Sequence, residues 1–279
     1  AAFAVTDHFD TCSHGDYDVF TPIRQAYETV CRLNEEGSPC RVLMGIEIGE
    51  SFREPAVYER VRNLVPYDAV IGSVHLVGDA DIYLEPYWAD KSYEEAIRLH
   101  LETTLECVRV HEDYDVLGHL TYISKARENP THELLRYEDH REMVDEILKE
   151  LVRKGKGMEI NTSGVDRCGG FLPTADYFRR FKELGGEIIT IGSDAHTASR
   201  VGQYAFEACE ILKDIFGRIE FKDVWFSYIE NEWVLKGVSF KVNAKETVAF
   251  VGSTGSGKTT ILSLIVRNYD IQKGQILID

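Results

Sequence analysis

Carboxylate and imidazole side chains follow a series of short apolar runs along this chain. Such side chains are the usual protein ligands of divalent metal ions, and a carboxylate placed between two metals can bridge them. A single histidine at the end of a run is more often a core or loop residue, and Asp194 alone could cap a turn. The repetition favours a shared metal site, because a rim lined with unpaired carboxylates would repel itself without cations. The candidate metal ligands are His8, Glu47, His75, His119, Asp194 and His196.

These ligands need a fold that brings the ends of separate strands together. Apolar runs of strand length alternate with helical patterns over residues 2–213, an order typical of βα units. The runs are 2–6, 42–48, 69–75, 115–119, 158–161 and 187–194, and the helical patterns are 22–33, 54–64, 93–111, 137–154, 175–184 and 203–213. In a parallel barrel the carboxyl ends of the strands meet at one rim, where such enzymes keep their chemistry. We therefore expect an α/β fold with the ligands as neighbours at that rim.

Glu47 is the natural bridging ligand of this set, and His75 and His119 would complete one metal. Metals that share a hydroxide provide a nucleophile near neutral pH and clamp phosphoryl oxygens in the transition state. Phosphoester hydrolysis benefits most from this chemistry, so the expected partner is a small phosphorylated metabolite. Zinc, manganese and iron accept the same donors, which leaves the metal open. The remaining histidines lie in charged surroundings and are expected to be solvated: His100, His111, His132 and His140.

Charge is distributed unevenly in this chain of 279 residues with a net charge of -16. Residues 217–279 carry 8 basic and 7 acidic residues, which leaves 23 against 40 in residues 1–216. This acidic first part disfavours nonspecific binding to nucleic acid. The six cysteines contain no CxxC pair, and no apolar run reaches the length of a membrane span. We expect a cytoplasmic protein with reduced thiols, no membrane span and no nucleic-acid partner.

A second texture begins at Gly217, where residues 219–226 alternate as in a half-buried strand. Further strands are expected at 238–242 and 247–251. The segment Gly252-Ser253-Thr254-Gly255-Ser256-Gly257-Lys258-Thr259 then matches G-x-x-x-x-G-K-[ST], and a helical run follows at 260–266. In this context the backbone N–H groups cradle phosphate, Lys258 reaches the β and γ phosphates, and Thr259 offers its hydroxyl to Mg²⁺. The alternative is a plain glycine turn.

Six segments, taken in chain order, resemble motifs of the PHP (polymerase and histidinol phosphatase) superfamily. They are Thr6-Asp7-His8, Gly45-Ile46-Glu47, Gly72-Ser73-Val74-His75, Gly118-His119, Glu159-Ile160-Asn161 and Gly192-Ser193-Asp194-Ala195-His196. The resemblance covers residues 1 to about 213 and is greatest to bacterial histidinol-phosphatases. It implies a distorted (β/α)7 TIM-like barrel over residues 1–214. It also implies hydrolysis of L-histidinol phosphate to L-histidinol and phosphate with two or three divalent metals (zinc, manganese or iron).

The same resemblance implies roles for individual residues. One metal would be held by His8 and His196 and another by His75 and His119, while Glu47 and Asp194 would bridge as catalytic ligands. The segment Asn161-Thr162-Ser163-Gly164 and a basic residue after it would line the phosphate pocket. Arg167 is the candidate for that contact and for a catalytic role, since guanidinium binds phosphate through two charge-assisted hydrogen bonds. Arg167 could instead be a surface arginine in a glycine-rich loop.

One departure concerns the start of the family pattern. The family opens with a His-x-His strand ahead of Thr6-Asp7-His8, whereas this chain begins after that point. The metal held by that pair would lose two ligands. We therefore expect lower metal affinity and lower turnover.

Residues 217–279 resemble the start of an exporter-type ABC transporter nucleotide-binding domain. In that family the aromatic ring at the position of Tyr228 stacks on adenine, although Tyr228 could also be a plain strand-end aromatic. The implied contacts to ATP and Mg²⁺ are Tyr228, Gly252, Gly255, Gly257, Lys258, Thr259 and Thr260. The segments needed for ATP turnover lie beyond the resemblance, so we expect weak nucleotide binding only. Two alternatives to the phosphatase stay open: an ATP-binding fragment of a transporter, or a nonfunctional fusion of two truncated genes.

Overall fold

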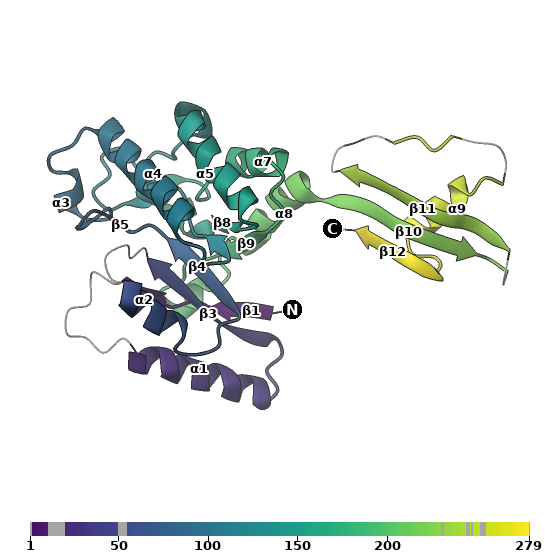
Figure 1. The fold of residues 1–279 in the computed structure, drawn as a ribbon, viewed down its shortest axis with the longest axis horizontal. Coiled ribbons are helices and arrows are strands. Elements are labelled where there is room, and N and C mark those ends of the chain that lie inside the picture. The colour runs from purple at the N-terminus through teal and green to yellow at the C-terminus, as the bar shows by residue number, and fades with distance from the viewer. Residues whose placement is uncertain are drawn as a thin grey trace. The chain divides into compact units, whose positions relative to one another are not determined.

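The computed structural model describes residues 2–10, 20–49, 55–229, 232–243, 246, 248–251 and 255–278. The chain divides into two compact units, Ala1–Ala208 and Cys209–Asp279, each of which is visible in Figure 1. The division lies inside helix α8 (Ala205–Phe216), a few residues ahead of the limits predicted at 214 and 217.

The first unit is built on a parallel sheet with the strand order β1-β3-β4-β7-β8-β9, and the short β2 pairs beside β3. Its strands are β1 Ala2–Val5, β2 His8–Phe9, β3 Arg41–Gly49, β4 Ala69–Ser73, β7 Val116–Leu117, β8 Gly157–Asn161 and β9 Ile189–Gly192. The six main strands follow chain order, as successive βα units require. This parallel half-barrel confirms the predicted TIM-like fold. Among the described residues, no hydrogen-bonded pairing joins β9 to β1.

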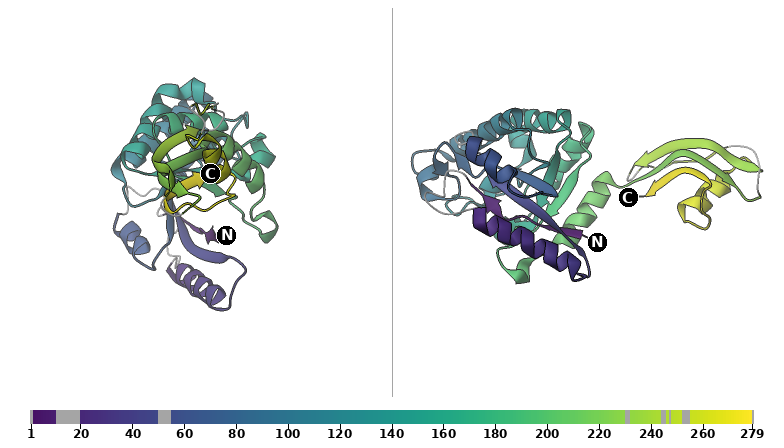
Figure 2. Two further views of the ribbon diagram at one scale, coloured as in Figure 1. Left: turned by 90° about the vertical axis from the view of Figure 1, so that its right-hand side faces the viewer. Right: turned by 60° about the horizontal axis from the view of Figure 1, so that its bottom comes forward.

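Helices connect the strands, and α1 packs along β3, as Figures 1 and 2 show. The helices of this unit are α1 Phe20–Glu35, α2 Pro55–Arg62, α3 Glu85–Trp88, α4 Tyr93–Val110, α5 Arg141–Arg153, α6 Val165–Cys168, α7 Ala175–Glu183 and the start of α8. Shorter elements are the hairpin of β5 Leu76–Val77 and β6 Ala80–Asp81, and the 3₁₀ turns η1 Tyr122–Lys125, η2 Tyr137–His140, η3 Thr162–Gly164 and η4 Ala198–Arg200. No helix among the described residues is both long and apolar enough to cross a bilayer.

The core explains why these segments fold as predicted. Ser92 caps α4 by accepting a hydrogen bond from the Glu95 backbone N–H at 3.2 Å, which satisfies one unpaired donor of the first turn. α4 packs against α5 through buried residues three or four positions apart, the spacing of one helix face. All five residues of β8 are buried, as expected of a parallel strand covered on both faces.

A partly buried ion pair joins α5 to α7. The Asp145 carboxylate accepts hydrogen bonds from the Arg180 guanidinium at 2.6 and 2.8 Å and from the Tyr137 hydroxyl at 2.8 Å. Replacing Asp145 by asparagine removes the charge and leaves Arg180 with the exposed Glu183 carboxylate, to which its Nη1 donates at 3.0 Å. We expect the free energy of unfolding to fall by about 2–3 kcal/mol. Urea denaturation measures this value.

A matched control is Asp176→Asn, because Asp176 pairs with Arg179 at 2.6 Å in an exposed position. That pair should contribute less than about 1 kcal/mol. Equal losses in the two variants would show that the buried network adds nothing beyond a surface contact.

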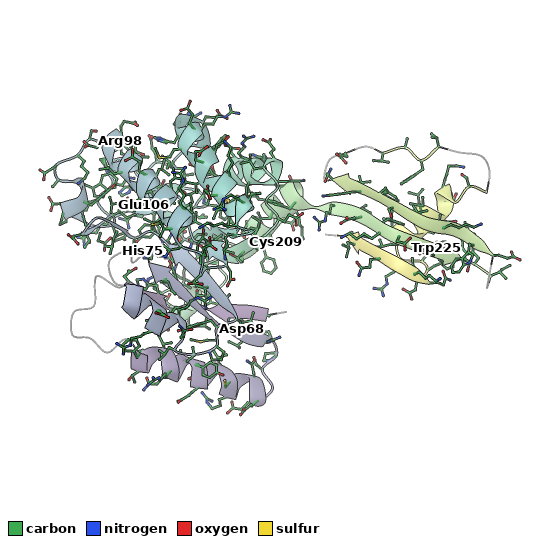
Figure 3. The ribbon with its side chains drawn as sticks, viewed as in Figure 1. Asp68, His75, Arg98, Glu106, Cys209 and Trp225 are labelled. Atoms are coloured by element: carbon green, nitrogen blue, oxygen red, sulfur yellow. The ribbon has the colours of Figure 1, made fainter. Side chains whose placement is uncertain are left out.

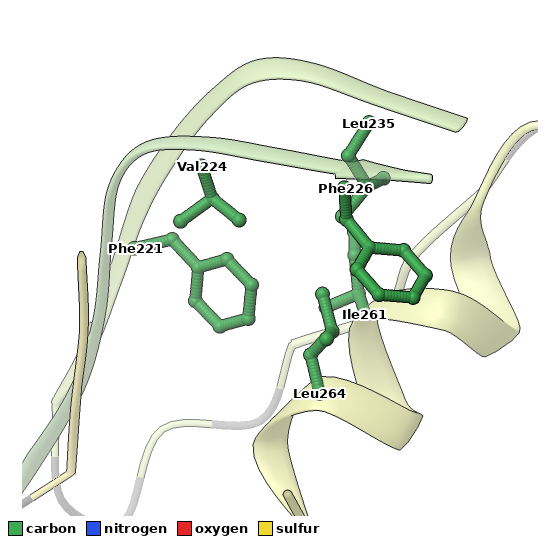
Figure 4. Close-up of a cluster of buried hydrophobic side chains, with 6 residues drawn as sticks. All are labelled: Phe221, Val224, Phe226, Leu235, Ile261 and Leu264. Carbon is green, nitrogen blue, oxygen red and sulfur yellow. The ribbon is translucent and has the colours of Figure 1, made fainter. Parts of the chain in front are cut away.

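The second unit is a three-stranded antiparallel sheet, in the order β11-β10-β12, with one helix packed on it. Its elements are β10 Arg218–Ser227, β11 Trp233–Asn243, α9 Lys258–Ile265 and β12 Lys273–Ile278. Figure 4 shows its core, which consists of Phe221, Val224, Phe226, Leu235, Ile261 and Leu264. The strands predicted at 219–226 and 238–242 lie within β10 and β11.

The strand predicted at 247–251 is wrong for the part that the structure describes, since residues 248–251 belong to no strand. Val251 is 89% exposed and Val248 47%, while Phe250 packs on the Phe240 ring with 5.3 Å between centroids. Apolar β-forming residues make a strand only beside a hydrogen-bonding neighbour. The three strands of this unit pair with one another and not with residues 248–251.

Candidate metal centre

Three side chains from the carboxyl ends of three adjacent strands meet in the first unit. Glu47 lies near the end of β3, and His75 and His119 follow β4 and β7 by two residues each. Glu47 Oε1 lies 2.8 Å from His119 Nε2 and 3.2 Å from His75 Nε2, and the two Nε2 atoms are 3.4 Å apart. One carboxylate oxygen and two imidazole nitrogens that converge in this way suit a divalent metal. His75 is marked in Figure 3.

Burial and mutual contact shift the titration of these groups. Burial pushes the pKa of Glu47 up, but the charges and hydrogen bonds of His119 and His75 outweigh it and hold that pKa well below its usual range. Burial pushes the pKa of His75 down, yet hydrogen bonds to Asp10 and Glu47 raise it well above its ordinary value. Glu47 therefore stays charged, and its charge favours either a metal cation at the site or a proton on His75.

The raised pKa of His75 predicts that the stability against unfolding depends on pH in opposite ways in the metal-free and the zinc-bound protein. In the metal-free form, stability from protonated His75 is complete below the pKa of the unfolded chain and is lost as pH rises through the raised value. Metal binding needs Nε2 without its proton, so stability conferred by zinc should grow over the same rise in pH. Thermal unfolding between pH 6 and 9, with and without zinc, measures both trends. Parallel trends in the two forms would contradict this assignment.

Asp10 belongs to the site but was not among the predicted ligands. Its Oδ1 accepts a hydrogen bond from His75 Nδ1 at 2.9 Å, and its Oδ2 lies 3.4 Å from His8 Nδ1. Burial raises the pKa of Asp10, but the two imidazoles more than offset this and lower it. Gly49 makes room for this carboxylate, since a Cβ there would overlap Oδ1. The sequence signal that could have identified Asp10 is its spacing of two residues from His8, because residues two apart in an extended segment face the same side.

Glu159 lies behind His119 and holds its backbone. Glu159 Oε2 accepts hydrogen bonds from the His119 N–H at 3.0 Å and from Asn161 Nδ2 at 3.1 Å. Burial raises the pKa of Glu159. A side chain at Gly192 would overlap the other carboxylate oxygen, so the glycine of β9 is needed for this packing. Glu159 thereby fixes the position from which the His119 ring reaches Glu47.

Asp194 follows β9 with a positive φ of 46°, which an aspartate tolerates better than most residues. Its carboxylate pairs with the Lys125 ammonium and lies 3.1 Å from Ser163 Oγ. Burial raises the pKa of Asp194, but the charges of Lys125 and His119 outweigh it, so the net shift is downward. Asp194 is therefore anionic, and it lies close enough to His119 and Glu47 for their charges to affect its pKa. No sequence motif pointed to Lys125, which lies in η1.

The other predicted site residues are placed around this centre. His196 is 79% exposed, with Nδ1 3.0 Å from the Asp194 carbonyl oxygen, and it joins no metal-ligating group found among the described residues. Asn161 Oδ1 accepts hydrogen bonds from Ser163, so its amide orders the turn after β8. Arg167 is exposed and donates to the Tyr83 hydroxyl at 2.7 Å.

The expectation that His100 is solvated is wrong. His100 is 1% exposed, and its Nε2 lies 3.1 Å from the carbonyl oxygen of Leu120, the residue after His119. Burial lowers the pKa of His100 to about 4, so the ring is neutral and donates this hydrogen bond. The charged neighbours of His100 in sequence point away, because it lies on the buried face of α4.

The phosphate loop is described from Gly255 onward, and Gly252 lies outside the described residues. Gly255 and Gly257 have φ values of 83° and 89°, a conformation that glycine adopts without strain. Lys258 and Thr259 form the first turn of α9, and Thr260 follows. The Thr260 hydroxyl lies 3.1 Å from the Tyr228 hydroxyl, so two of the predicted nucleotide contacts are neighbours.

A TIM-like half-barrel with a histidine and carboxylate cluster at its strand ends defines the class of this protein. The chain belongs to the PHP domain family, whose profile matches residues 1–163. It is 34% identical over 199 residues to a histidinol-phosphatase of Lactococcus lactis, which covers 70% of this chain and 72% of that relative. A probable histidinol-phosphatase of Clostridium acetobutylicum is 32% identical over 165 residues, covering 58% of this chain and 63% of that relative.

The fold of the first unit also matches a solved structure of a histidinol phosphate phosphatase. The crystal structure of histidinol phosphate phosphatase from Lactococcus lactis, complexed with zinc, L-histidinol and phosphate, superposes with a TM-score of 0.66 and 29% identity. The match covers 76% of this chain and 81% of that one.

The second unit has relatives of a different kind. The ABC transporter profile matches residues 235–279. An ATP-dependent lipid A-core flippase of Saccharophagus degradans is 54% identical over 63 residues, which is 23% of this chain but 11% of that protein. The chain therefore joins a PHP domain to a fragment related to ABC exporters.

Proposed function

We propose that residues 1–214 form a metal-dependent phosphomonoester hydrolase that converts L-histidinol phosphate to L-histidinol and phosphate. The observation that carries this proposal is the convergence of Glu47 Oε1, His75 Nε2 and His119 Nε2 within 3.4 Å of one another. The histidinol-phosphatase relatives support the choice of substrate.

The donors found among the described residues provide for two divalent metals, and a third is implied by the family resemblance alone. Two groups of potential ligands share His75: one with Glu47 and His119, the other with His8 and Asp10. Nitrogen and oxygen donors of this kind accept zinc, manganese or iron, and zinc is present in the related structure. We favour zinc for that reason.

The residues of this chain prepare the site for phosphoester cleavage. A bound divalent metal supplies an activated water near neutral pH and neutralises phosphoryl charge. Asp10 holds the proton of His75 on Nδ1, which turns Nε2 toward Glu47. We assign catalytic roles to Glu47 and Asp194 and place Arg167 at the rim, where its guanidinium can bind the phosphate of the incoming substrate.

Phosphate release from L-histidinol phosphate tests this function. The full chain is stripped with a chelator, reloaded with zinc, manganese or iron, and assayed beside β-glycerophosphate as a generic monoester. We expect activity to depend on reloading and to favour L-histidinol phosphate. Absence of both bound metal and phosphate release under all three conditions would overturn the proposal.

For residues 217–279 we propose weak binding of Mg²⁺ and ATP without turnover. The supporting observation is that the positive-φ glycines Gly255 and Gly257 lead into the N-terminus of α9, where unpaired backbone N–H groups can bind phosphate. A nucleotide titration compares the parent with Lys258→Ala. Equal binding by the two would remove this proposal and leave the fragment as a nonfunctional part of a fusion.

A further inference from the structure

The positively charged side chain of Lys125 lies beside the candidate metal centre of the first unit, paired with Asp194. The Lys125 side chain is 12% exposed, and its ammonium donates to Asp194 Oδ2 and to Ser163 Oγ, the latter at 2.7 Å. A buried lysine is costly unless its charge is paired. Here the pairing partner is a predicted catalytic carboxylate rather than a surface residue.

One aromatic ring connects this ammonium to the imidazoles. Lys125 Nζ lies 4.9 Å from the centre of the Tyr122 ring. The same ring has its centroid 4.8 Å from that of His119 and 5.2 Å from that of His75. The Tyr122 ring therefore contacts both the Lys125 ammonium and the imidazoles of the candidate centre, whereas Arg167 is exposed beside Tyr83.

A phosphate monoester is a dianion, and the side chains around the centre are mainly carboxylates. The carboxylates of Asp10, Glu47 and Asp194 are held here by His75, His119 and Lys125, and negative charge of this kind repels an anionic substrate unless a cation faces it. An ammonium group has three N–H donors. Among the described residues, Asp194 and Ser163 accept two of them, which leaves one N–H donor for a further acceptor.

We propose that Lys125 binds the phosphoryl group of the substrate, with the Ser163 hydroxyl beside it. This inference rests on the proposed phosphatase function and adds a binding residue to it. Lys125 and Ser163 come from the segments after β7 and β8, so the phosphoryl group is held between neighbouring strands of the rim. The competing explanation is that Lys125 only positions Asp194.

Phosphate affinity distinguishes the two explanations. Inorganic phosphate is titrated into the zinc-loaded full chain by calorimetry, and zinc content is measured on the same samples. We expect Lys125→Met to weaken phosphate binding about 10- to 100-fold with zinc content unchanged, because a charge-assisted hydrogen bond is lost. Lys125→Arg should restore most of the affinity.

Lys91→Met is the matched control, because Lys91 also lies 4.9 Å from a tyrosine ring, that of Tyr87, but outside the centre. It should bind phosphate as the parent does. Unchanged phosphate affinity in Lys125→Met overturns the proposal, and a loss of zinc without loss of phosphate affinity assigns Lys125 to positioning Asp194. If Lys125→Met does not fold, as judged by near-ultraviolet circular dichroism, equal affinities of Lys125→Gln and Lys125→Arg overturn it.

These experiments distinguish a failure of the Lys125 proposal from a failure of the proposed phosphatase function. Phosphate binding that depends on Lys125 without turnover of L-histidinol phosphate would support the binding site and reject the substrate. Turnover of L-histidinol phosphate with an unaffected Lys125→Met variant would do the reverse.

Discussion

Glu47→Gln is expected to lower zinc affinity by at least about 100-fold and to remove phosphatase activity in proportion. Glu47 Oε1 is the oxygen that both His119 Nε2 and His75 Nε2 approach. Glutamine has nearly the same shape but lacks the charge, and losing even an outer partner of a metal ligand costs 10- to 100-fold in affinity. Equilibrium dialysis against zinc, with phosphate release from L-histidinol phosphate on the same samples, measures both effects.

The matched control is Glu106→Gln, which makes the same change on the exposed face of α4 (Glu106 is marked in Figure 3). This variant should match the parent in both assays. Because Glu47 is buried, removing its charge could also perturb folding, and thermal unfolding of the metal-free protein reports on this. Unchanged zinc affinity in a folded Glu47→Gln variant would exclude Glu47 as a ligand.

The sequence predicted the centre where strand order alone determines proximity. Glu47, His75 and His119 lie at or just after the carboxyl ends of β3, β4 and β7, which are neighbours in the sheet. Parallel strands that follow chain order bring such ends together whatever the loops do. The approximate boundaries of most elements in the first unit could also be predicted, because they follow from the local periodicity of apolar residues.

Two features that the sequence analysis missed, the role of Lys125 and the burial of His100, depend on tertiary contacts that residue spacing does not reveal. Lys125 reaches Asp194 across 69 positions of sequence, and His100 faces Leu120 because α4 turns that side inward. A charged neighbourhood in sequence is therefore a poor guide to exposure on an amphipathic helix. His196 shows the opposite case: the motif suggested a ligand, but its ring is largely exposed in this structure.

The second unit shows the same limit for strands. Residues 219–226 alternate in polarity and lie within β10, which pairs with β11 on one side and β12 on the other. Residues 248–251 are as apolar but pair with nothing among the described strands. Composition favours a strand, whereas a partner is needed to form one.

Asp10→Asn is expected to weaken zinc binding about 10- to 100-fold without unfolding the protein. The Asp10 carboxylate can only accept hydrogen bonds, so it fixes the proton of His75 on Nδ1 and keeps Nε2 directed at Glu47. An asparagine amide can present either its oxygen or its NH₂ group to that nitrogen, which no longer selects one tautomer. Outer partners of metal-ligating histidines typically contribute this much to affinity.

Competition with a chelating dye gives both the affinity and the number of zinc ions bound by Asp10→Asn, and these two results separate its possible roles. Asp10 also forms a potential ligand group with His8 and His75. If Asp10 orients His75, the affinity falls and the stoichiometry is kept; if Asp10 is itself a ligand, one equivalent of zinc is lost. Asp176→Asn, at an exposed position of α7, should change neither value. An unchanged affinity in Asp10→Asn would show that His75 keeps its orientation without this carboxylate.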